Sequence, residues 1–250
     1  MAVDPVDPVD PMKSDPDRRG AEGGRELSTA TRGVGQILTD LNHHDGGPDA
    51  FWRLLERGTK VRSDHGSARP LTGDQELWEP LLHHGDLVVT GHLYVPTAIV
   101  VTGSLTVGGC LSDREDGSRI VVGGNLTARA VFSAGDLLVR GDLGADIVSC
   151  VCLDPRTTAT GTVRARLVLE EDPGDRGAAT VDAGIHLDYD TYRLGWDDRE
   201  GLREQLRALL VDEVFTKDDD SDGDDELRLD RYELFDRLLA GEPVFHDDVR

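Results

Sequence analysis

Apolar residues recur at a fixed step of six through the middle of this chain of 250 residues. The phrase "IVVTGSLTVGG", which begins at Ile99, returns as "IVVGGNLTARA" from Ile120 and as "LLVRGDLGADI" from Leu137. A six-residue step is typical of a parallel β-helix, in which three short strands make one coil of about 18 residues and each coil stacks on the one before it. An antiparallel sheet would need hairpin turns and would show no constant step. The repeat therefore predicts a mainly β solenoid.

Residues one coil apart test this interpretation, because they should lie directly above one another. The first expected stack runs Leu87, Leu105, Leu126, Leu143, Val163 and Val181. The second runs Leu93, Leu111, Phe132, Ser149, Leu169 and Leu187, and the third runs Ile99, Ile120 and Leu137 before it fades at Thr157 and Asp175. One insertion or deletion at a corner accounts for each departure from a regular step. We predict a single-stranded parallel β-helix of about six coils over residues 86–192.

Within each unit, alternation predicts that Ile99 and Val101 point inward while Val100 and Thr102 point outward. Glycines recur at the fifth position of the units, at Gly91, Gly103, Gly124 and Gly141. A glycine there suits a tight corner, where a Cβ would intrude or where the backbone angle is one that other residues avoid.

The flanking segments differ in character from the repeats. Three Val-Asp-Pro triplets indicate a disordered acidic tail over residues 1–25. Residues 26–85 are expected to be an N-terminal helical segment, with loop over 59–85 and one short helix around "DQELWEPLL". Two helices are predicted over residues 193–250. The first is capped by Asp197 or Asp198, and the second begins at Asp230 and ends before Gly241. We expect short helical segments to cap both ends of the solenoid.

The charge balance limits the classes of partner. There are 27 basic and 49 acidic residues, a net charge of −22, which argues against a nucleic acid or an anionic membrane as partner. A basic protein partner fits better, although acidity also promotes solubility. No apolar stretch is long enough for membrane insertion. Three cysteines, Cys110, Cys150 and Cys152, make no closed disulfide set, so a reducing cytoplasm is expected.

One acidic stretch invites a calcium interpretation. Asp218, Asp220, Asp222 and Asp224, with Gly223 among them, resemble the start of an EF-hand loop. The match then fails, because Asp225 stands where an apolar residue is expected and Leu229 stands where a bidentate Glu is expected. We therefore expect a solvated acidic loop over 218–226, and no metal or cofactor.

Three outward positions predict a protein-binding surface. Val100, Val121 and Leu138 should stack on one outer wall, where a solvated wall would carry Thr, Lys or Glu. Such an apolar ladder needs a cover. Two alternatives follow: one of the chain's own helices lies on it, or it is a site for a partner or for self-association.

The Val-rich strands, the phrases "VVTGSL" and "VVGGNL" and the coil length resemble bactofilins, the bacterial polymer-forming cytoskeletal proteins, over about residues 86–192. The resemblance implies a right-handed β-helix without nucleotide or catalysis that assembles through its solenoid. Helical segments on both sides of the repeats lead us to expect capped ends and a discrete protein, not filaments.

Other functions are weighed against this scaffold interpretation. Left-handed hexapeptide acyltransferases share the six-residue step, but the second positions here, such as Val88 and Thr106, are not the small residue of that family, and His83, His84, His92 and His186 stand in no motif. We therefore predict a non-enzymatic, protein-binding scaffold. The alternative from another class is an acidic, immunity-type protein that neutralises a basic toxin.

Overall fold

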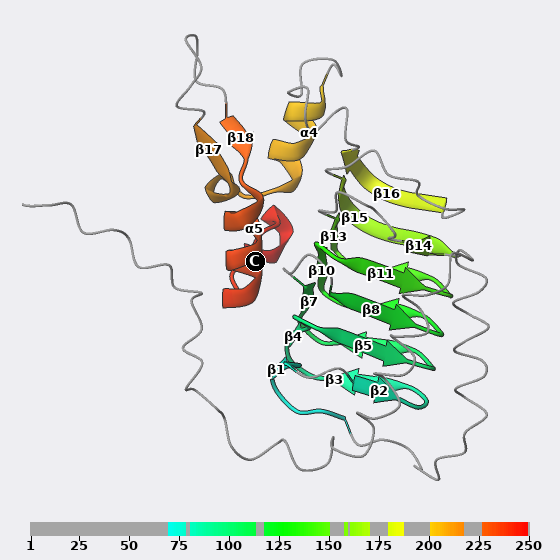
Figure 1. Ribbon diagram of the computed structural model, residues 1–250. Helices are drawn as coiled ribbons and strands as arrows, with labels where there is room; N and C mark the ends of the chain where they lie inside the picture. Colours follow the sequence, from blue (N-terminus) through cyan, green and yellow to red (C-terminus); the bar gives the residue numbers. More distant parts are fainter. Residues whose placement is uncertain are drawn as a thin grey trace, which may run out of the picture.

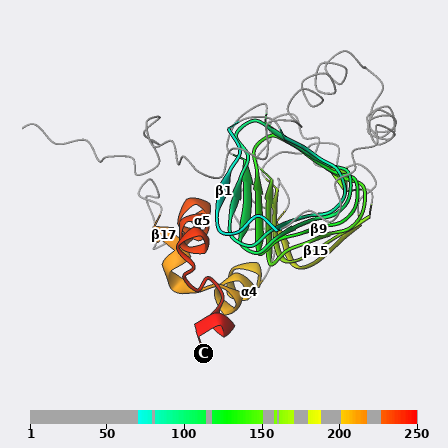
Figure 2. The ribbon, with the colours of Figure 1, turned by 90° about the horizontal axis from the view of Figure 1, so that it is seen from below.

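The structure of the chain is a computed structural model, which describes residues 70–78, 81–113, 118–150, 158–159, 161–170, 180–187, 201–217 and 227–249. Over residues 71–187 it is a parallel β-solenoid of about five turns with about 18 residues per turn, as the six-residue step predicts. Figure 1 shows the strands stacked like the rungs of a ladder, and Figure 2 looks along the stack into a three-walled tube.

Three walls make up the tube, and every strand in them runs parallel to its neighbours. The first wall contains β3 (Leu87–Val89), β6 (Leu105–Val107), β9 (Leu126–Thr127), β12 (Leu143–Gly144) and the starts of β15 (Thr162–Glu170) and β16 (Thr180–Leu187). The second wall contains β1 (Gln75–Glu76), β4 (Leu93–Tyr94), β7 (Cys110–Asp113), β10 (Ala130–Ser133), β13 (Ile147–Cys150) and the ends of β15 and β16. The third wall contains β2 (Leu81–His83), β5 (Ala98–Val101), β8 (Arg119–Val122), β11 (Asp136–Val139) and β14 (Thr158–Ala159).

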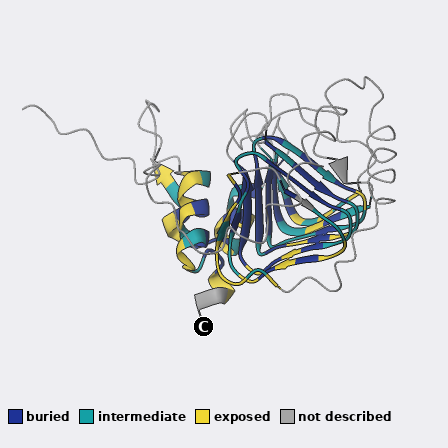
Figure 3. Cartoon of the chain, turned by 60° about the horizontal axis from the view of Figure 1, so that its bottom comes forward, coloured by how far each residue is buried: buried dark blue, intermediate teal, exposed yellow. Residues whose placement is uncertain are grey.

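The first predicted stack is confirmed at every step. Leu87 pairs with Leu105, Leu105 with Leu126, Leu126 with Leu143, Leu143 with Val163 and Val163 with Val181. On the third wall Ile99, Ile120 and Leu137 are likewise in register. These side chains point into the tube and form one continuous apolar core. Figure 3 shows buried residues along the strands of all three walls.

The second predicted stack is wrong by one position from Phe132 onward, so Phe132, Ser149, Leu169 and Leu187 form an outward stack of their own. Leu93 pairs with Leu111 as expected, but Leu111 pairs with Val131, and Phe132 pairs with Ser112. Val131 therefore fills the core, while Phe132 points outward. The reason is that Val131 and Phe132 are both apolar, so alternation alone does not decide which of them faces inward.

The solenoid also begins earlier than residue 86. The helix expected around "DQELWEPLL" does not form; β1 and β2 occupy this stretch and pair in register with β4 and β5. Leu71 bridges to Val89 one coil later. Among the described residues, β14 is the last strand of the third wall, and the solenoid has about five turns where about six were expected.

Close contact between coils explains the corner glycines. A Cβ on Gly124 would lie 2.9 Å from the carbonyl carbon of Gly103 and 2.9 Å from the backbone nitrogen of Ser104, one coil earlier. Because real Cβ atoms essentially never approach backbone atoms this closely, any side chain at Gly124 would force the corner to shift. The predicted reason, a Cβ that would intrude, applies here.

The chain ends in a second, smaller unit, here called the C-terminal unit (residues 201–217 and 227–249). It contains α4 (Leu202–Leu209), the 3₁₀ turns Asp212–Val214 and His246–Val249, the antiparallel pair β17 (Phe215–Lys217) and β18 (Leu227–Leu229), and α5 (Arg231–Ala240). Asp230 caps α5 by accepting hydrogen bonds from the N–H groups of Tyr232 and Glu233, and Gly241 ends it with φ 73°, as predicted. For α4 the predicted aspartate cap is wrong, since the N-cap is Gly201.

The C-terminal unit packs along the outside of the second wall. Its apolar residues share one cluster with outward side chains of the wall, from Cys110 and Phe132 near the middle of the stack to Leu187 at its end. In Figure 2 the unit lies beside the tube. The C-terminal helices therefore cover outward apolar residues of a side wall, and the expectation that they also cap an end of the solenoid stays a prediction. The expected N-terminal tail and the helices before residue 59 lie outside the described residues.

Candidate functional site

The three residues of the predicted outward stack on the third wall do pair in register with one another. Val100 pairs with Val121, and Val121 pairs with Leu138, while Ile99 and Val101 point into the core. Val100 and Val121 are 0% exposed, and Leu138 is half-buried. Neither valine belongs to the two hydrophobic clusters that the described residues form. The two valines are thus buried in the free chain and Leu138 only partly, and the use of these residues as an interaction surface stays a prediction.

The calcium candidates Asp218, Asp220, Asp222 and Asp224 lie outside the described residues, so the acidic loop also stays a prediction. Within the described part of the chain, no three His, Cys, Asp or Glu side chains are grouped so that they could hold a metal ion.

Three of the four histidines considered for acyl transfer have contacts within the solenoid. His92 Nδ1 accepts a hydrogen bond from the N–H of Cys110 at 2.9 Å. His83 Nε2 lies 3.0 Å from the carbonyl oxygen of Asp86, and His186 Nε2 lies 2.9 Å from Glu170 Oε1. His84 is half-buried. These contacts join the histidines to neighbouring strands and corners of the solenoid. They do not bring the four side chains together at one site.

Two buried titratable groups are also bound into the fold. Burial raises the pKa of the Cys110 thiol to about 12, so it stays protonated and packs as a small apolar group. Asp113 is 1% exposed and accepts hydrogen bonds from Ser133 Oγ and from the N–H groups of Ala134 and Gly135. Burial is the largest influence on its pKa and raises it. Cys150 is half-buried, and Cys152 lies outside the described residues.

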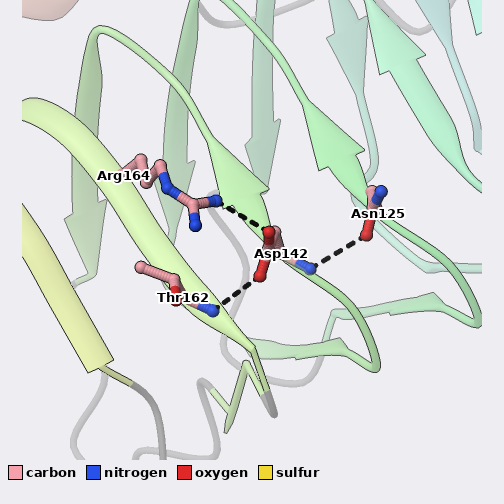
Figure 4. A network of polar contacts seen from close by, with 4 residues as sticks. All are labelled: Asn125, Asp142, Thr162 and Arg164. Carbon is pink, nitrogen blue, oxygen red and sulfur yellow. Dashed lines mark hydrogen bonds and ion pairs between the residues drawn. The ribbon is translucent and has the colours of Figure 1, made fainter.

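A ladder of polar side chains follows the corner before the first wall. Asn125 Oδ1 accepts from the N–H of Asp142 at 3.0 Å, and Asp142 Oδ1 accepts from the N–H of Thr162 at 2.8 Å (Figure 4). Arg164 donates to the other carboxylate oxygen of Asp142 at 2.7 Å. The backbone donor of Thr162 and then Arg164 lower the pKa of Asp142. These hydrogen bonds therefore hold successive coils together. The side-chain oxygens of Asn125 and Asp142 already accept from donors of the next coil.

The second wall carries an exposed aromatic patch, formed by Glu76, Trp78 and Tyr94. Trp78 is 54% exposed, one of three large apolar side chains exposed in the described part of the chain. Its indole N–H donates to Glu76 Oε2 at 3.0 Å, and its ring meets that of Tyr94 edge to face, with the centroids 5.9 Å apart. Two contacts therefore hold an indole that remains open to solvent.

The sequence does not reveal this patch, because the residues around "DQELWEPLL" are predicted to be loop and a short helix. Glu76 pairs with Tyr94, one coil later. Extending the coil step backward from Leu93 would have placed Gln75 in a strand and Glu76 beside Tyr94 on the outer face.

Comparison with known proteins adds no relative. No family model matches the chain, and neither a curated protein nor a solved structure shows significant similarity to it. In the described residues, no helix has the length and apolar character needed to cross a membrane.

Proposed function

We propose that this protein is a non-enzymatic, bactofilin-like scaffold that binds a protein partner through the outer walls of its solenoid. One observation carries the proposal: the second wall already serves as a docking surface inside the chain. Phe132 on the wall and Phe235 on α5 pack with their ring centroids 4.1 Å apart, and Cys110, Leu169 and Leu187 belong to the same buried cluster.

A solenoid suits this role because parallel walls present a rigid surface on which side chains repeat at a constant spacing. A partner element can then bind without ordering the wall first, which lowers the entropic cost of association.

A second candidate is a neutralising protein for a basic toxin. The net charge of −22 favours this class, because opposite charge speeds the encounter with a basic partner. In this case the partner would have an activity of its own that the complex abolishes.

Site-specific photocrosslinking in the native cell tests the proposal. The crosslinker replaces Thr72, which precedes β1, or Val88 on the first wall, both of which are exposed. Tyr232 on α5 is the matched control, because it is 63% exposed but lies off the solenoid. We expect a discrete adduct with a second protein from a solenoid position and none from Tyr232. The purified partner should then bind in a fixed ratio by calorimetry.

Equal crosslinking from all three positions, or no adduct from any solenoid position, would contradict a wall-based scaffold. Loss of the partner's own activity in the complex would select the neutralising candidate, and unchanged activity would select the scaffold.

A further inference from the structure

We propose that the aromatic patch (Glu76, Trp78 and Tyr94) is the partner site of the solenoid and that it takes an arginine side chain from a basic protein segment. This inference rests on the proposed function and names its surface and the chemistry of its partner.

The patch continues a surface that the chain already uses for docking. One outward stack on the second wall runs Glu76, Tyr94, Ser112, Phe132, Ser149, Leu169 and Leu187. Phe132, Leu169 and Leu187 of this stack lie in the cluster that the C-terminal unit covers. Glu76 and Tyr94 are not members of that cluster, and Trp78 beside them is open. This end of the wall, where Glu76 and Trp78 are exposed, is thus aromatic and acidic.

A contact between the C-terminal unit and the solenoid shows how an aromatic ring and a carboxylate together bind an arginine, here with Arg166 on the solenoid and Phe245 and Asp247 on the unit. The guanidinium of Arg166 lies 3.6 Å from the ring centroid of Phe245, and its Nη2 atom lies 2.7 Å from Asp247 Oδ1. A ring face and a carboxylate together therefore hold one arginine at this interface. Trp78 and Glu76 present the same two groups, with the indole as the better ring for a cation.

Charge and preorganisation favour the same occupant. Glu76 is exposed on the outer side of β1, and Asp74 just before β1 is exposed while one of its carboxylate oxygens accepts from the N–H of His92 at 2.7 Å, so the surroundings of the patch are acidic. The hydrogen bond to Glu76 and the edge contact with Tyr94 already orient the indole. An incoming guanidinium would stack on the ring and pair with the carboxylate while few rotamers remain to be ordered.

Fluorescence anisotropy with a short labelled peptide of alternating arginine and glycine tests the site on the full chain, and a peptide with glutamate in place of arginine is the probe control. We expect saturable binding of the arginine peptide, weakened about tenfold by Trp78→Ala, the size typical of a cation over an indole. Glu76→Gln keeps the shape and should weaken binding severalfold. The indole N–H resonance of Trp78 should shift on titration.

Tyr232→Ala is the matched control, since it removes an exposed aromatic side chain from α5 and should leave binding unchanged. Because Trp78 is exposed, Trp78→Ala should melt as the wild type does; if its melting falls, Trp78→Phe and Glu76→Gln decide in its place. Binding of the arginine peptide that is insensitive to both Trp78 and Glu76 substitutions, or equally sensitive to Tyr232→Ala, would overturn the inference.

Failure here differs from failure of the scaffold proposal. A partner that crosslinks from Val88 alone, with no effect of Trp78→Ala on its affinity, would leave the scaffold function standing and place its site on the first wall.

Discussion

The backbone N–H of Gly124 donates to the carbonyl oxygen of Gly103, one coil earlier, at 2.8 Å. This contact leaves no room for a side chain on Gly124. Gly124→Ala should therefore lower the free energy of unfolding by about 1–3 kcal/mol, the range typical of overpacking. Urea titration followed by circular dichroism measures this change.

Gly144 provides the control, because a Cβ added there meets nothing within 4 Å. Gly144→Ala should change the free energy of unfolding by less than about 0.5 kcal/mol. Equal destabilisation by the two substitutions would contradict the close-contact explanation.

The interface of the C-terminal unit depends on Phe235, which is buried against Phe132. Phe235→Ala should cost about 3–5 kcal/mol, as for other large aromatic truncations, and should loosen the unit from the wall. Limited proteolysis should then cut near α4 and α5 while the solenoid stays protected. Tyr232→Ala on the same helix should leave the cleavage pattern of the wild type; if Phe235→Ala does so too, the unit is held by other contacts.

The outward valines of the third wall allow a test of whether the chain itself buries them. Because Val121 is 0% exposed in the chain itself, Val121→Glu should destabilise by about 3–5 kcal/mol, the cost typical of an uncompensated buried charge. Thr106→Glu, at an exposed outward position of the first wall, is the control. Differential scanning calorimetry compares the two variants. Unchanged melting of Val121→Glu together with lost partner binding would instead make this ladder the external site.

The buried carboxyl of Asp113 should make stability depend on pH. Since burial raises its pKa in the native state above the usual 3.8, its contribution is fully present below the unfolded pKa and is lost as the pH rises through the native pKa. Asp113→Asn keeps an oxygen acceptor for the N–H of Gly135 and has no such dependence. The free energy of unfolding of the wild type minus that of the variant should therefore fall as the pH rises from about 4 toward neutrality.

Urea titrations of both proteins over this pH range measure the difference. A difference that increases with pH would mean that the hydrogen bonds from Ser133, Ala134 and Gly135 outweigh burial and favour the ionised carboxylate.

The solenoid and most of its register follow from the spacing of apolar residues along the chain. Leu87, Leu105 and Leu126 stack as their spacing predicts, because inward positions must be apolar and each coil must satisfy the backbone hydrogen bonds of the next. The boundaries of α5 also follow from local chemistry, since Asp230 caps its first turn and Gly241 ends it in the left-handed region.

The contacts of the outward residues depend on packing between distant segments and cannot be predicted from the spacing. Val131 and Phe132 are both apolar neighbours, and Phe132 faces outward, where Phe235 from a distant helix packs against it. An amphipathic pattern shows that α4 and α5 bury one face, but it does not show that they bury it against a side wall. The aromatic patch has the same origin: Glu76 and Tyr94 are brought together by the coil repeat, and the indole of Trp78 is positioned by side-chain contacts to both. Local periodicity determines which residues of a strand point inward and which point outward. Which outer surfaces pack against each other depends on contacts between residues far apart in the chain.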